Sequence, residues 1–299
     1  MSSPLVVSLG EVLWDLLPSG PQLGGAPANF AGQVGSLGGA AALVSRIGSD
    51  PLGERARERL VRLGVELSGL QQSPHAPTGT VGVTVDAAGQ PRYTIHEGAA
   101  WDELEVTEAA VSLVKDARAV CFGTLAQRSL PSRTTLRALL DRVPDSALIL
   151  CDLNLRAPFY DRTLVEDSLQ RATVAKLNDQ ELTVLADWFG FPDSLEGQVQ
   201  ALAEQFNLEE VVLTLGAAGS GLWSHGRFIR GPQVTVTVVD TVGAGDAFAA
   251  AYLLGRLRNF SPTDRLYHAT QVAAFVCTHA GALPELPEAL TTPFRVARS

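Results

Sequence analysis

Residues 172–215 read ATVAKLNDQELTVLADWFGFPDSLEGQVQALAEQFNLEEVVLTL, with an apolar run at each end. The runs Ala172–Leu177 and Val211–Leu215 are short and rich in β-branched residues, which is typical of buried strands. Between them lie two amphipathic stretches of helical length, Asn178–Trp188 and Leu195–Phe206. A strand followed by helices and then by another strand predicts a parallel sheet with helices packed on it.

The same alternation continues outward over most of the chain. Buried strands are also predicted at Leu5–Leu9, Ala42–Ile47, Ala119–Phe122 and Leu148–Leu153, and helices at Gly53–Leu63 and Ser132–Arg142. We therefore predict an α/β fold with a mainly parallel sheet flanked by helices. Residues 1–299 contain no linker, repeat or low-complexity tract, so we expect a single domain.

One region breaks this alternation. Thr80–Val85 and Arg92–His96 have the pattern of two short strands, and the loop Asp86-Ala-Ala-Gly89 between them predicts a hairpin. Val12–Leu17 is a third short strand. We expect residues 12–18 and 80–101 to form a small sheet that stands off the main one.

The composition restricts the partners and the compartment. The formal net charge is −9, and nucleic acids and anionic membranes require a basic surface, so neither is an expected partner. No apolar run approaches the roughly eighteen residues that span a membrane, and the first residues lack the basic segment of a signal peptide. Cys121, Cys151 and Cys277 are isolated, which is typical of reduced, structural cysteines. We expect a soluble, cytoplasmic protein.

Ligands of open α/β sheets bind outside the carboxyl ends of the strands. The residues that follow the predicted strands are small or polar: Gly10-Glu11, Gly48-Ser49-Asp50, Gly123-Thr124, Asp152-Leu153-Asn154, Asn178 and Gly216. We expect the functional site to lie at this edge of the sheet.

The segment Asp240–Phe248 reads DTVGAGDAF and precedes a helix of small and apolar residues. Gly243, Ala244 and Gly245 carry no bulky side chains, so their N–H groups can approach an anion at the helix N-terminus. Asp246 is a carboxylate at the same place. Either it interacts favourably with the helix dipole, or it is a general base beside a transferring phosphoryl group whose charge the amides stabilise.

Two other uses of a glycine-rich segment are not supported. A Walker-type loop requires a lysine after its last glycine, and neither Lys115 nor Lys176 stands in such a context. The dinucleotide fingerprint requires a glycine or alanine where Phe248 stands, and it should follow the first strand of a βαβ unit. The sequence therefore does not indicate hydride transfer.

A second segment, Gly24–Ala31, reads GGAPANFA and runs into a helix. Its two leading glycines let the backbone approach a polar ligand. Asn29 can both donate and accept hydrogen bonds, as sugar hydroxyls require. Taken alone, the segment can equally be a loop followed by an ordinary helical asparagine.

Together these segments resemble the ribokinase-like (PfkB-type) carbohydrate kinases, over essentially the whole chain. Asp240-Thr-x-Gly-Ala-Gly-Asp246 is similar to the carboxyl-terminal signature of that family. Gly24-Gly-x-x-x-Asn29, with Gly48-x-Asp50 and Gly53, is similar to the amino-terminal signature. The resemblance implies a ribokinase-like three-layer fold, a β-sheet lid over the sugar, and transfer of the γ-phosphoryl group of ATP to a sugar hydroxyl.

The resemblance also assigns roles to residues. Asp246 would be the catalytic base, and the amides of Gly243, Ala244, Gly245 and Asp246 would form the anion hole. Asp15, Gly25 and Asn29 match sugar contacts. Asn178-x-x-Glu181 matches a motif that organises Mg²⁺ and its waters, although the same two residues also form a capping-box-like pair at a helix start.

For ATP, the resemblance implies contacts from Lys176, Asn178, Thr214, Gly216, Gly219, Ala273 and Cys277. It implies a monovalent cation, K⁺, near Asp240. In relatives the lids often pair between subunits, which hides the edge of a small sheet. We therefore expect a homodimer formed through the lid.

The sugar is less closely defined. Gly10–Pro18 and Asp152–Arg156 are similar to the fructokinase branch, which favours fructose. Arg156 can approach a sugar ring, or it can bind the carboxylate of 2-keto-3-deoxygluconate, since arginine is a bidentate partner of carboxylates. Further expected sugar contacts are Glu97, Trp101 and Gln127, whereas His96 is expected at the surface.

Two alternatives to a fructokinase stay open. One is a kinase of the same family that acts on a sugar acid, another sugar or a nucleoside. The other is a non-catalytic sensor built on the kinase fold, in which the base or the anion hole would be lost. This chain keeps Asp246 and both glycines, Gly243 and Gly245, which favours an enzyme.

Overall fold

The computed structural model describes residues 3–85 and 91–295, and its core is a large sheet built as the sequence predicts. Its parallel strands are β1 (Leu5–Leu9), β4 (Ala40–Gly48), β5 (Val65–Glu66), β6 (Leu70–Ser73), β9 (Ala119–Phe122), β10 (Leu148–Asp152), β11 (Val174–Asn178) and β12 (Glu210–Thr214). An antiparallel hairpin, β13 (Ser220–Ser224) and β14 (Arg227–Arg230), extends one edge. The prediction of a mainly parallel sheet is confirmed, and the hairpin is an addition to it.

The strands are apolar throughout because both faces of the sheet are covered. Val6 and Leu43 belong to one core cluster, whereas their neighbours Val7 and Val44 belong to the other. Successive side chains of a strand point to opposite faces, so each strand supplies both clusters.

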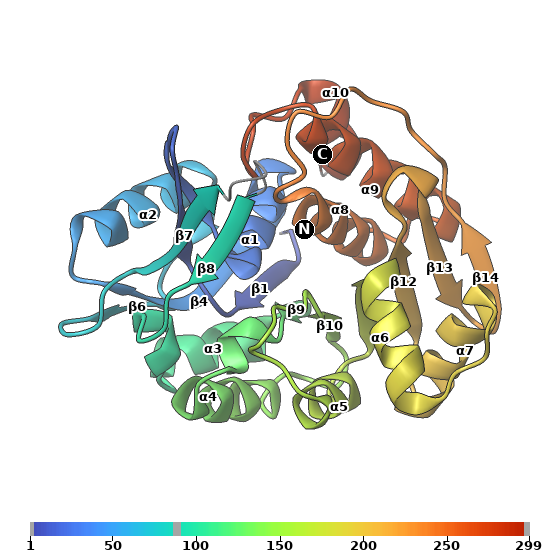
Figure 1. Ribbon diagram of the computed structural model, residues 1–299, viewed down its shortest axis with the longest axis horizontal. Coiled ribbons are helices and arrows are strands. Elements are labelled where there is room, and N and C mark those ends of the chain that lie inside the picture. Colours follow the sequence, from blue (N-terminus) through green and yellow to red (C-terminus); the bar gives the residue numbers. More distant parts are fainter. Residues whose placement is uncertain (1–2, 86–90, 296–299) are drawn as a thin grey trace.

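The helices form two layers, one on each face of the sheet (Figure 1). One layer contains α1 (Ala26–Ser36), α2 (Pro51–Arg62), α8 (Ala244–Leu257) and α9 (Pro262–Cys277). The other contains α3 (Glu108–Asp116), α4 (Leu130–Leu140), α5 (Arg162–Gln170), α6 (Asp179–Phe189) and α7 (Leu195–Phe206). A short helix, α10 (Glu288–Thr291), follows α9.

A second, four-stranded sheet stands apart from the main one, beside α1 and α2 (Figure 1). Its strand order is β3-β2-β7-β8, with β2 (Leu13–Leu17), β3 (Gly20–Gly24), β7 (Gly79–Val85) and β8 (Pro91–Ile95). The predicted small sheet is therefore present, and β3 is a strand that the sequence analysis did not predict. The predicted hairpin loop Asp86–Gly89 lies outside the described residues.

The strand order creates a topological switch point at β1. From β1 the chain first builds β4 on one side, and later builds β9 on the other side. The connections after β1 and β9 therefore diverge, and a crevice opens at their carboxyl ends. The chain places Gly10-Glu11 and Gly123-Thr124 at this crevice.

Within the described ranges, none of the helices combines the length and the apolar character needed to cross a bilayer.

Candidate active site

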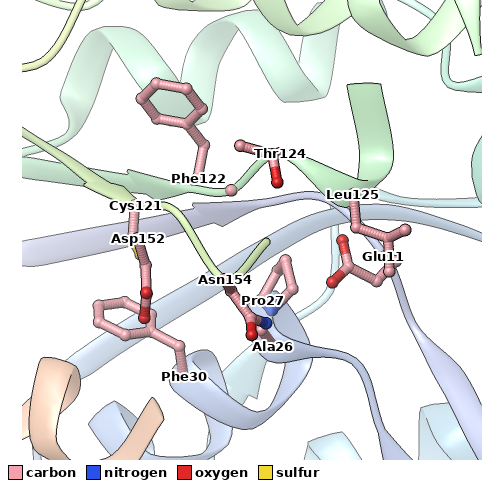
Figure 2. Close-up of a pocket in the computed structure, with 11 residues that line it drawn as sticks. Glu11, Ala26, Pro27, Phe30, Cys121, Phe122, Thr124, Leu125, Asp152 and Asn154 are labelled. Carbon is pink, nitrogen blue, oxygen red and sulfur yellow. The ribbon is translucent and has the colours of Figure 1, made fainter. Parts of the chain in front are cut away.

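A pocket lies at the switch point, where the ends of β1, β9 and β10 meet the start of α1 (Figure 2). Its lining consists of Glu11, Ala26, Pro27, Phe30, Cys121, Phe122, Gly123, Thr124, Leu125, Asp152 and Asn154. In Figure 2 the carboxyl groups of Glu11 and Asp152 lie on two sides of Asn154. Asn154 has φ 41°, in the left-handed region that asparagine tolerates better than most residues, which allows a sharp turn directly after β10. Strand-end residues therefore converge as predicted.

The N-terminus of α8 is shaped by glycines. Gly243 caps the helix with φ 77°, and a Cβ atom at this position would lie 2.3 Å from the Ala282 Cβ atom. A Cβ atom on Gly245 would lie 3.0 Å from the Lys176 Nζ atom, so an amine stands directly at this helix end. Of the predicted anion-hole amides, that of Ala244 donates to the Thr241 carbonyl at 3.3 Å.

Asp246 lies in the first turn of α8 and is joined to α1 by a hydrogen bond. The Asn29 Nδ2 atom donates to the Asp246 Oδ2 atom at 2.9 Å. Asn29 is 3% exposed, and its Oδ1 atom is buried without a hydrogen-bond partner among the described residues. The two signature segments thus meet at the carboxylate, and Asn29 keeps one acceptor available for a ligand hydroxyl.

The surroundings of Asp246 make it a stronger base than a free aspartate. The pKa of Asp246 is raised to about 6, mainly by burial and in addition by the nearby Asp152 charge. Lys176, the Asn29 hydrogen bond and Arg156 act in the opposite direction. A pKa near 6 leaves the group ionised at neutral pH and suits it to accept a proton.

Asp152 and Lys176 form a buried ion pair beneath α8. The Lys176 Nζ atom lies 3.0 Å from both carboxylate oxygens of Asp152. The two residues are paired in register on the neighbouring strands β10 and β11. Burial lowers the pKa of Lys176, but Asp152, Glu181 and Asp246 together raise it above its usual value. The amine therefore stays protonated beside Gly245.

Asn178 and Glu181 form a complete capping box at the start of α6. The Glu181 amide donates to the Asn178 Oδ1 atom, and the Asn178 amide donates to the Glu181 Oε2 atom, both at 2.8 Å. The Glu181 Oε1 atom accepts from the Leu155 amide, also at 2.8 Å. Both carboxylate oxygens of Glu181 thus accept backbone hydrogen bonds. Glu181 can therefore contact a metal ion more easily through a water molecule than as a direct ligand. Within residues 3–85 and 91–295, no group of three His, Cys, Asp or Glu side chains has the arrangement of a metal site.

Asp15 lies on β2 and faces the glycine segment. A Cβ atom on Gly24 would lie 2.6 Å from the Asp15 Oδ2 atom, and one on Gly25 would lie 2.6 Å from the Glu11 carbonyl oxygen. Burial raises the pKa of Asp15, Arg156 opposes this shift, and Asp240 adds to it. The absence of side chains at Gly24 and Gly25 therefore lets Asp15 and Glu11 come close to the start of α1.

Glu11 is a site residue to which the sequence analysis gave no role beyond its place at a strand end. It is 2% exposed, and its Oε2 atom has no hydrogen-bond partner in the described part of the chain. Burial raises its pKa to about 7, backbone hydrogen bonds oppose this shift, and Asp246 contributes to it. Arg156 is exposed, and its charge acts on Glu11, Asp15, Asp152 and Asp246 alike.

The lining of this pocket includes none of the expected sugar contacts, and two of them, Trp101 and Gln127, are buried in contacts of their own. Trp101 is completely buried and lies under the Arg128 guanidinium, whose central carbon is 4.0 Å from the ring centroid. The Gln127 side chain is buried and donates to the Gly123 carbonyl and the Ser168 hydroxyl, at 2.9 and 3.0 Å. Glu97 is exposed, just after the end of β8. Trp101 and Gln127 therefore lie behind the pocket wall.

Lys176 and Asn178, two of the residues expected to bind the nucleotide, lie on β11, and the others lie around the neighbouring strand β12 and the end of α9. Thr214 ends β12, and Gly216 and Gly219 follow it with φ 55° and 91°. Ala273 and Cys277 are half-buried on α9. The Val239 amide donates to the Cys277 carbonyl at 2.8 Å, so the segment before α8 runs beside these residues.

Asp240 organises the approach to α8. Its Oδ1 atom accepts from the Val242 amide at 3.0 Å, and its Oδ2 atom accepts from the Gly281 amide at 2.9 Å. These bonds join the signature segment to the loop after α9. The monovalent cation near Asp240 stays a prediction.

The chain is similar to known carbohydrate kinases along nearly its whole length. The family model described as pfkB family carbohydrate kinase matches residues 21–289. Fructokinase-1 of Zea mays is 31% identical over 309 residues, which cover 95% of this chain and 94% of that protein.

Solved structures give the same likeness. A sugar kinase of Pyrococcus horikoshii in complex with ATP is 28% identical and has a TM-score of 0.78, covering 93% of this chain and 94% of the other. The fructokinase of Xylella fastidiosa with bound ATP has a TM-score of 0.85 over 97% of both chains, at 24% identity. At 24% identity, the fructokinase shows a shared fold only. The Pyrococcus sugar kinase, at 28% identity, is also similar in sequence.

Proposed function

This chain belongs to the pfkB family of carbohydrate kinases, and from that premise we propose that it transfers the γ-phosphoryl group of ATP to a hydroxyl of fructose. The observation that carries the proposal is the hydrogen bond between Asn29 and Asp246. It puts the base at the N-terminus of α8 within reach of the glycine segment that approaches the sugar. Fructokinases among the relatives support fructose as the acceptor.

In this mechanism Asp246 accepts the proton of the attacking sugar hydroxyl. The amides at the start of α8 and the Lys176 amine stabilise the charge on the phosphoryl group in transfer. Phosphoryl transfer has a loose transition state, so positioning and electrostatics supply most of the acceleration. Asn29 holds the Asp246 carboxylate in place through the 2.9 Å bond.

Magnesium fits the chemistry of the site when it is bound through water. Mg²⁺ keeps several waters and takes few direct protein ligands, together with substrate phosphates. Asn178 and Glu181 are engaged in their capping box and offer their remaining lone pairs to such waters. When bound, the ion neutralises phosphate charge.

The sugar is proposed to lie between the start of α1 and the small sheet. Asp15, the backbone at Gly25 and the free Asn29 acceptor are its proposed contacts, with Arg156 at the rim. Trp101 and Gln127 are proposed to support the wall from behind, since both are buried. The small sheet acts as the lid, which excludes water that would compete with the sugar hydroxyl.

The charges of the site favour a neutral sugar over a sugar acid. Four carboxylates, of Glu11, Asp15, Asp152 and Asp246, are within the electrostatic range of Arg156. Lys176 is the second cation, and Asp152 already pairs with it. A substrate carboxylate would enter an environment that is already rich in negative charge, and this costs energy.

The adenine is proposed to lie against α9, near Ala273 and Cys277. Val238 and Val239 are 56% and 64% exposed, and the Val239 amide bonds to Cys277. Exposed valines beside a half-buried helix face offer an apolar surface to a base. We propose that the turn with Gly216 and Gly219 also contacts ATP. We propose that a monovalent cation binds near Asp240.

We also propose that residues 1–299 act as one domain. One core cluster of buried residues extends from Val6 to Phe294, which supports this.

An ADP-release assay tests the function. Fructose, glucose, ribose, 2-keto-3-deoxygluconate and adenosine are compared as acceptors with Mg-ATP, using Asp246→Asn as the inactive control. The expected result is the highest kcat/KM with fructose. Turnover of 2-keto-3-deoxygluconate alone would contradict the argument from charge, and ATP binding without turnover of any acceptor would indicate a sensor.

A further inference from the structure

A second pocket of about 370 Å³ lies between α2, the strands β2 and β3, and the loop Ala280–Leu283. Its lining consists of Trp14, Pro21, Gln22, Leu23, Arg55, Glu58, Arg59, Arg62, Ala280, Gly281, Ala282 and Leu283. It shares no lining residue with the pocket at the switch point. Its volume is within the range of about 300–1,000 Å³ that is usual for small-molecule sites.

The wall that α2 contributes is basic. Arg55, Arg59 and Arg62 line the pocket, because residues spaced by three or four positions lie on one face of a helix. Glu58 is the acidic residue in the lining. This concentration of positive charge stands out in a chain whose formal net charge is −9.

Two of these arginines are held in place without using a carboxylate. The Arg55 guanidinium stacks on Trp14, with its central carbon 4.7 Å from the ring centroid. The Arg59 Nη2 atom donates to the Leu283 carbonyl at 3.0 Å. Neither has an acidic partner within 4.0 Å among the described residues, whereas Arg62 pairs with Glu58 at 3.3 Å.

Arginines fixed in this way suit a phosphate group. A guanidinium presents several N–H donors in a planar fork, which binds phosphate oxygens in pairs. Stacking on Trp14 leaves the edge of the Arg55 fork available, and one contact to a carbonyl leaves most of the Arg59 donors available. Pro21, Leu23 and Leu283 add apolar surface for the carbon body of a ligand.

We propose that this pocket is a binding site for a small phosphorylated organic molecule, of the sugar phosphate class, separate from the catalytic site. The proposal does not depend on which sugar the kinase phosphorylates. It rests on the pocket, on two oriented arginines without acidic partners in the described part of the chain, and on the adjacent apolar surface.

An occupant of this pocket would touch the loop that packs against the start of α8. Besides Arg59, this loop is held by Gln33, which donates to the Ala282 carbonyl at 2.8 Å, and by the bond between Gly281 and Asp240. Ala282 packs directly on Gly243. Binding in this pocket is therefore connected to the N-terminus of the catalytic helix through one short loop.

The test is isothermal titration of fructose 6-phosphate, and separately of inorganic phosphate, into the full-length protein without ATP. The variants are Arg55→Ala, Arg59→Ala and the double variant. Arg57→Ala is the matched control, because Arg57 lies on the same helix, pairs with Glu54 and does not line the pocket. We expect each single variant to weaken fructose 6-phosphate binding about tenfold, as a lost charged hydrogen bond does, while Arg57→Ala binds as the wild type does.

Fructose turnover and the melting temperature are measured in parallel for every variant. The Arg55→Ala variant should keep the wild-type values of both, which separates this site from the catalytic one. Equal affinity of the wild type and the double variant for fructose 6-phosphate would overturn the proposal. So would ATP-dependent phosphorylation of fructose 1-phosphate that is lost in the double variant, because the arginines would then belong to the substrate site.

Discussion

The proposed role of Asp246 depends on its neighbours more than on its position in a helix. An aspartate in the first turn of a helix is ordinary, since it interacts favourably with the helix dipole. Here Asn29 from another helix bonds to it, and Lys176 stands beside it across Gly245. The sequence left two interpretations open, an interaction with the helix dipole and a general base. The two are compatible, because a carboxylate at the start of α8 can also accept a proton from a ligand.

Replacing Asp246 by asparagine should remove the base while keeping the shape of the site. We expect kcat to fall by about 10²–10⁴, the usual contribution of general base catalysis. The affinity for ATP, measured by titration without sugar, should change little, because the α8 amides and Lys176 remain. Full turnover by this variant would show that another group accepts the proton.

The pH dependence should report the ionisation of Asp246. Because burial raises its pKa to about 6 and the deprotonated form is active, kcat/KM should rise with pH through about 6 and then level off. The Asn29 hydrogen bond lowers this pKa, so in Asn29→Ala the midpoint should move to higher pH. If the pH–rate profiles of the wild type and of Asn29→Ala have the same midpoint, the assignment of this midpoint to Asp246 is wrong.

At the scale of the element, α8 is fixed by a buried ionic network on its far side. Glu210 on β12 is 2% exposed and accepts from the Tyr252 hydroxyl at 2.6 Å. The Arg265 Nη1 atom, from α9, lies 2.9 Å from both Glu210 oxygens. One carboxylate thus joins the sheet, the catalytic helix and its neighbour.

Removing that carboxylate should be costly because it leaves the Arg265 charge buried without its acidic partner. We expect Glu210→Gln to lower the free energy of unfolding by about 3–5 kcal/mol in urea titrations. Glu58→Gln is the control, since its pair with Arg62 is exposed, and it should cost less than about 1 kcal/mol. Equal stability of the two variants would mean that the buried network has no net effect on folding.

The elements that the sequence predicted best are those with strong local patterns. The strands β1 and β9 and the helix α7 begin and end at the predicted residues, because each is apolar or amphipathic over its whole length. The strand β3 reads GPQLG, and its glycines and proline indicate a loop; its pairing with β2 is what makes it a strand. The hairpin of β13 and β14 was missed because it is an antiparallel addition to a parallel pattern.

The same limit applies to the site. The signature segments indicated Asp246 and Asn29 from sequence, but the partner of Lys176 could not be predicted. Asp152 and Lys176 meet because β10 and β11 pair in one particular register, which no local pattern determines. Trp101 and Gln127 were expected at the sugar, and their tertiary surroundings instead place them behind the pocket wall.

At the scale of the whole molecule, β3 and β8 are the edge strands of the small sheet, and neither pairs with a further strand among the described residues. Leu16 and Tyr93 on this sheet are 38% and 56% exposed. Exposed edges and apolar side chains are commonly covered by another chain, which supports the homodimer expected from the sequence.

The dimer can be tested with charge substitutions. We expect the wild type to have the mass of a dimer in sedimentation velocity, and Leu16→Glu combined with Tyr93→Glu to have the mass of a monomer. Leu130→Glu is the control, because Leu130 is 72% exposed on α4 and should leave the mass unchanged. A monomeric wild type at micromolar concentration would rule out the lid dimer.

The contact between Asn29 and Asp246 spans 217 positions of the chain, and this has a consequence for biosynthesis. Strand β1 lies in the interior of the sheet and is made well before α8, the helix that carries Asp246. Contacts between such distant positions form late, because a long loop must close before they stabilise anything. A nascent chain still on the ribosome would therefore hold the proposed sugar-facing half of the centre without the proposed base, and phosphoryl transfer should begin only when α8 docks against α1.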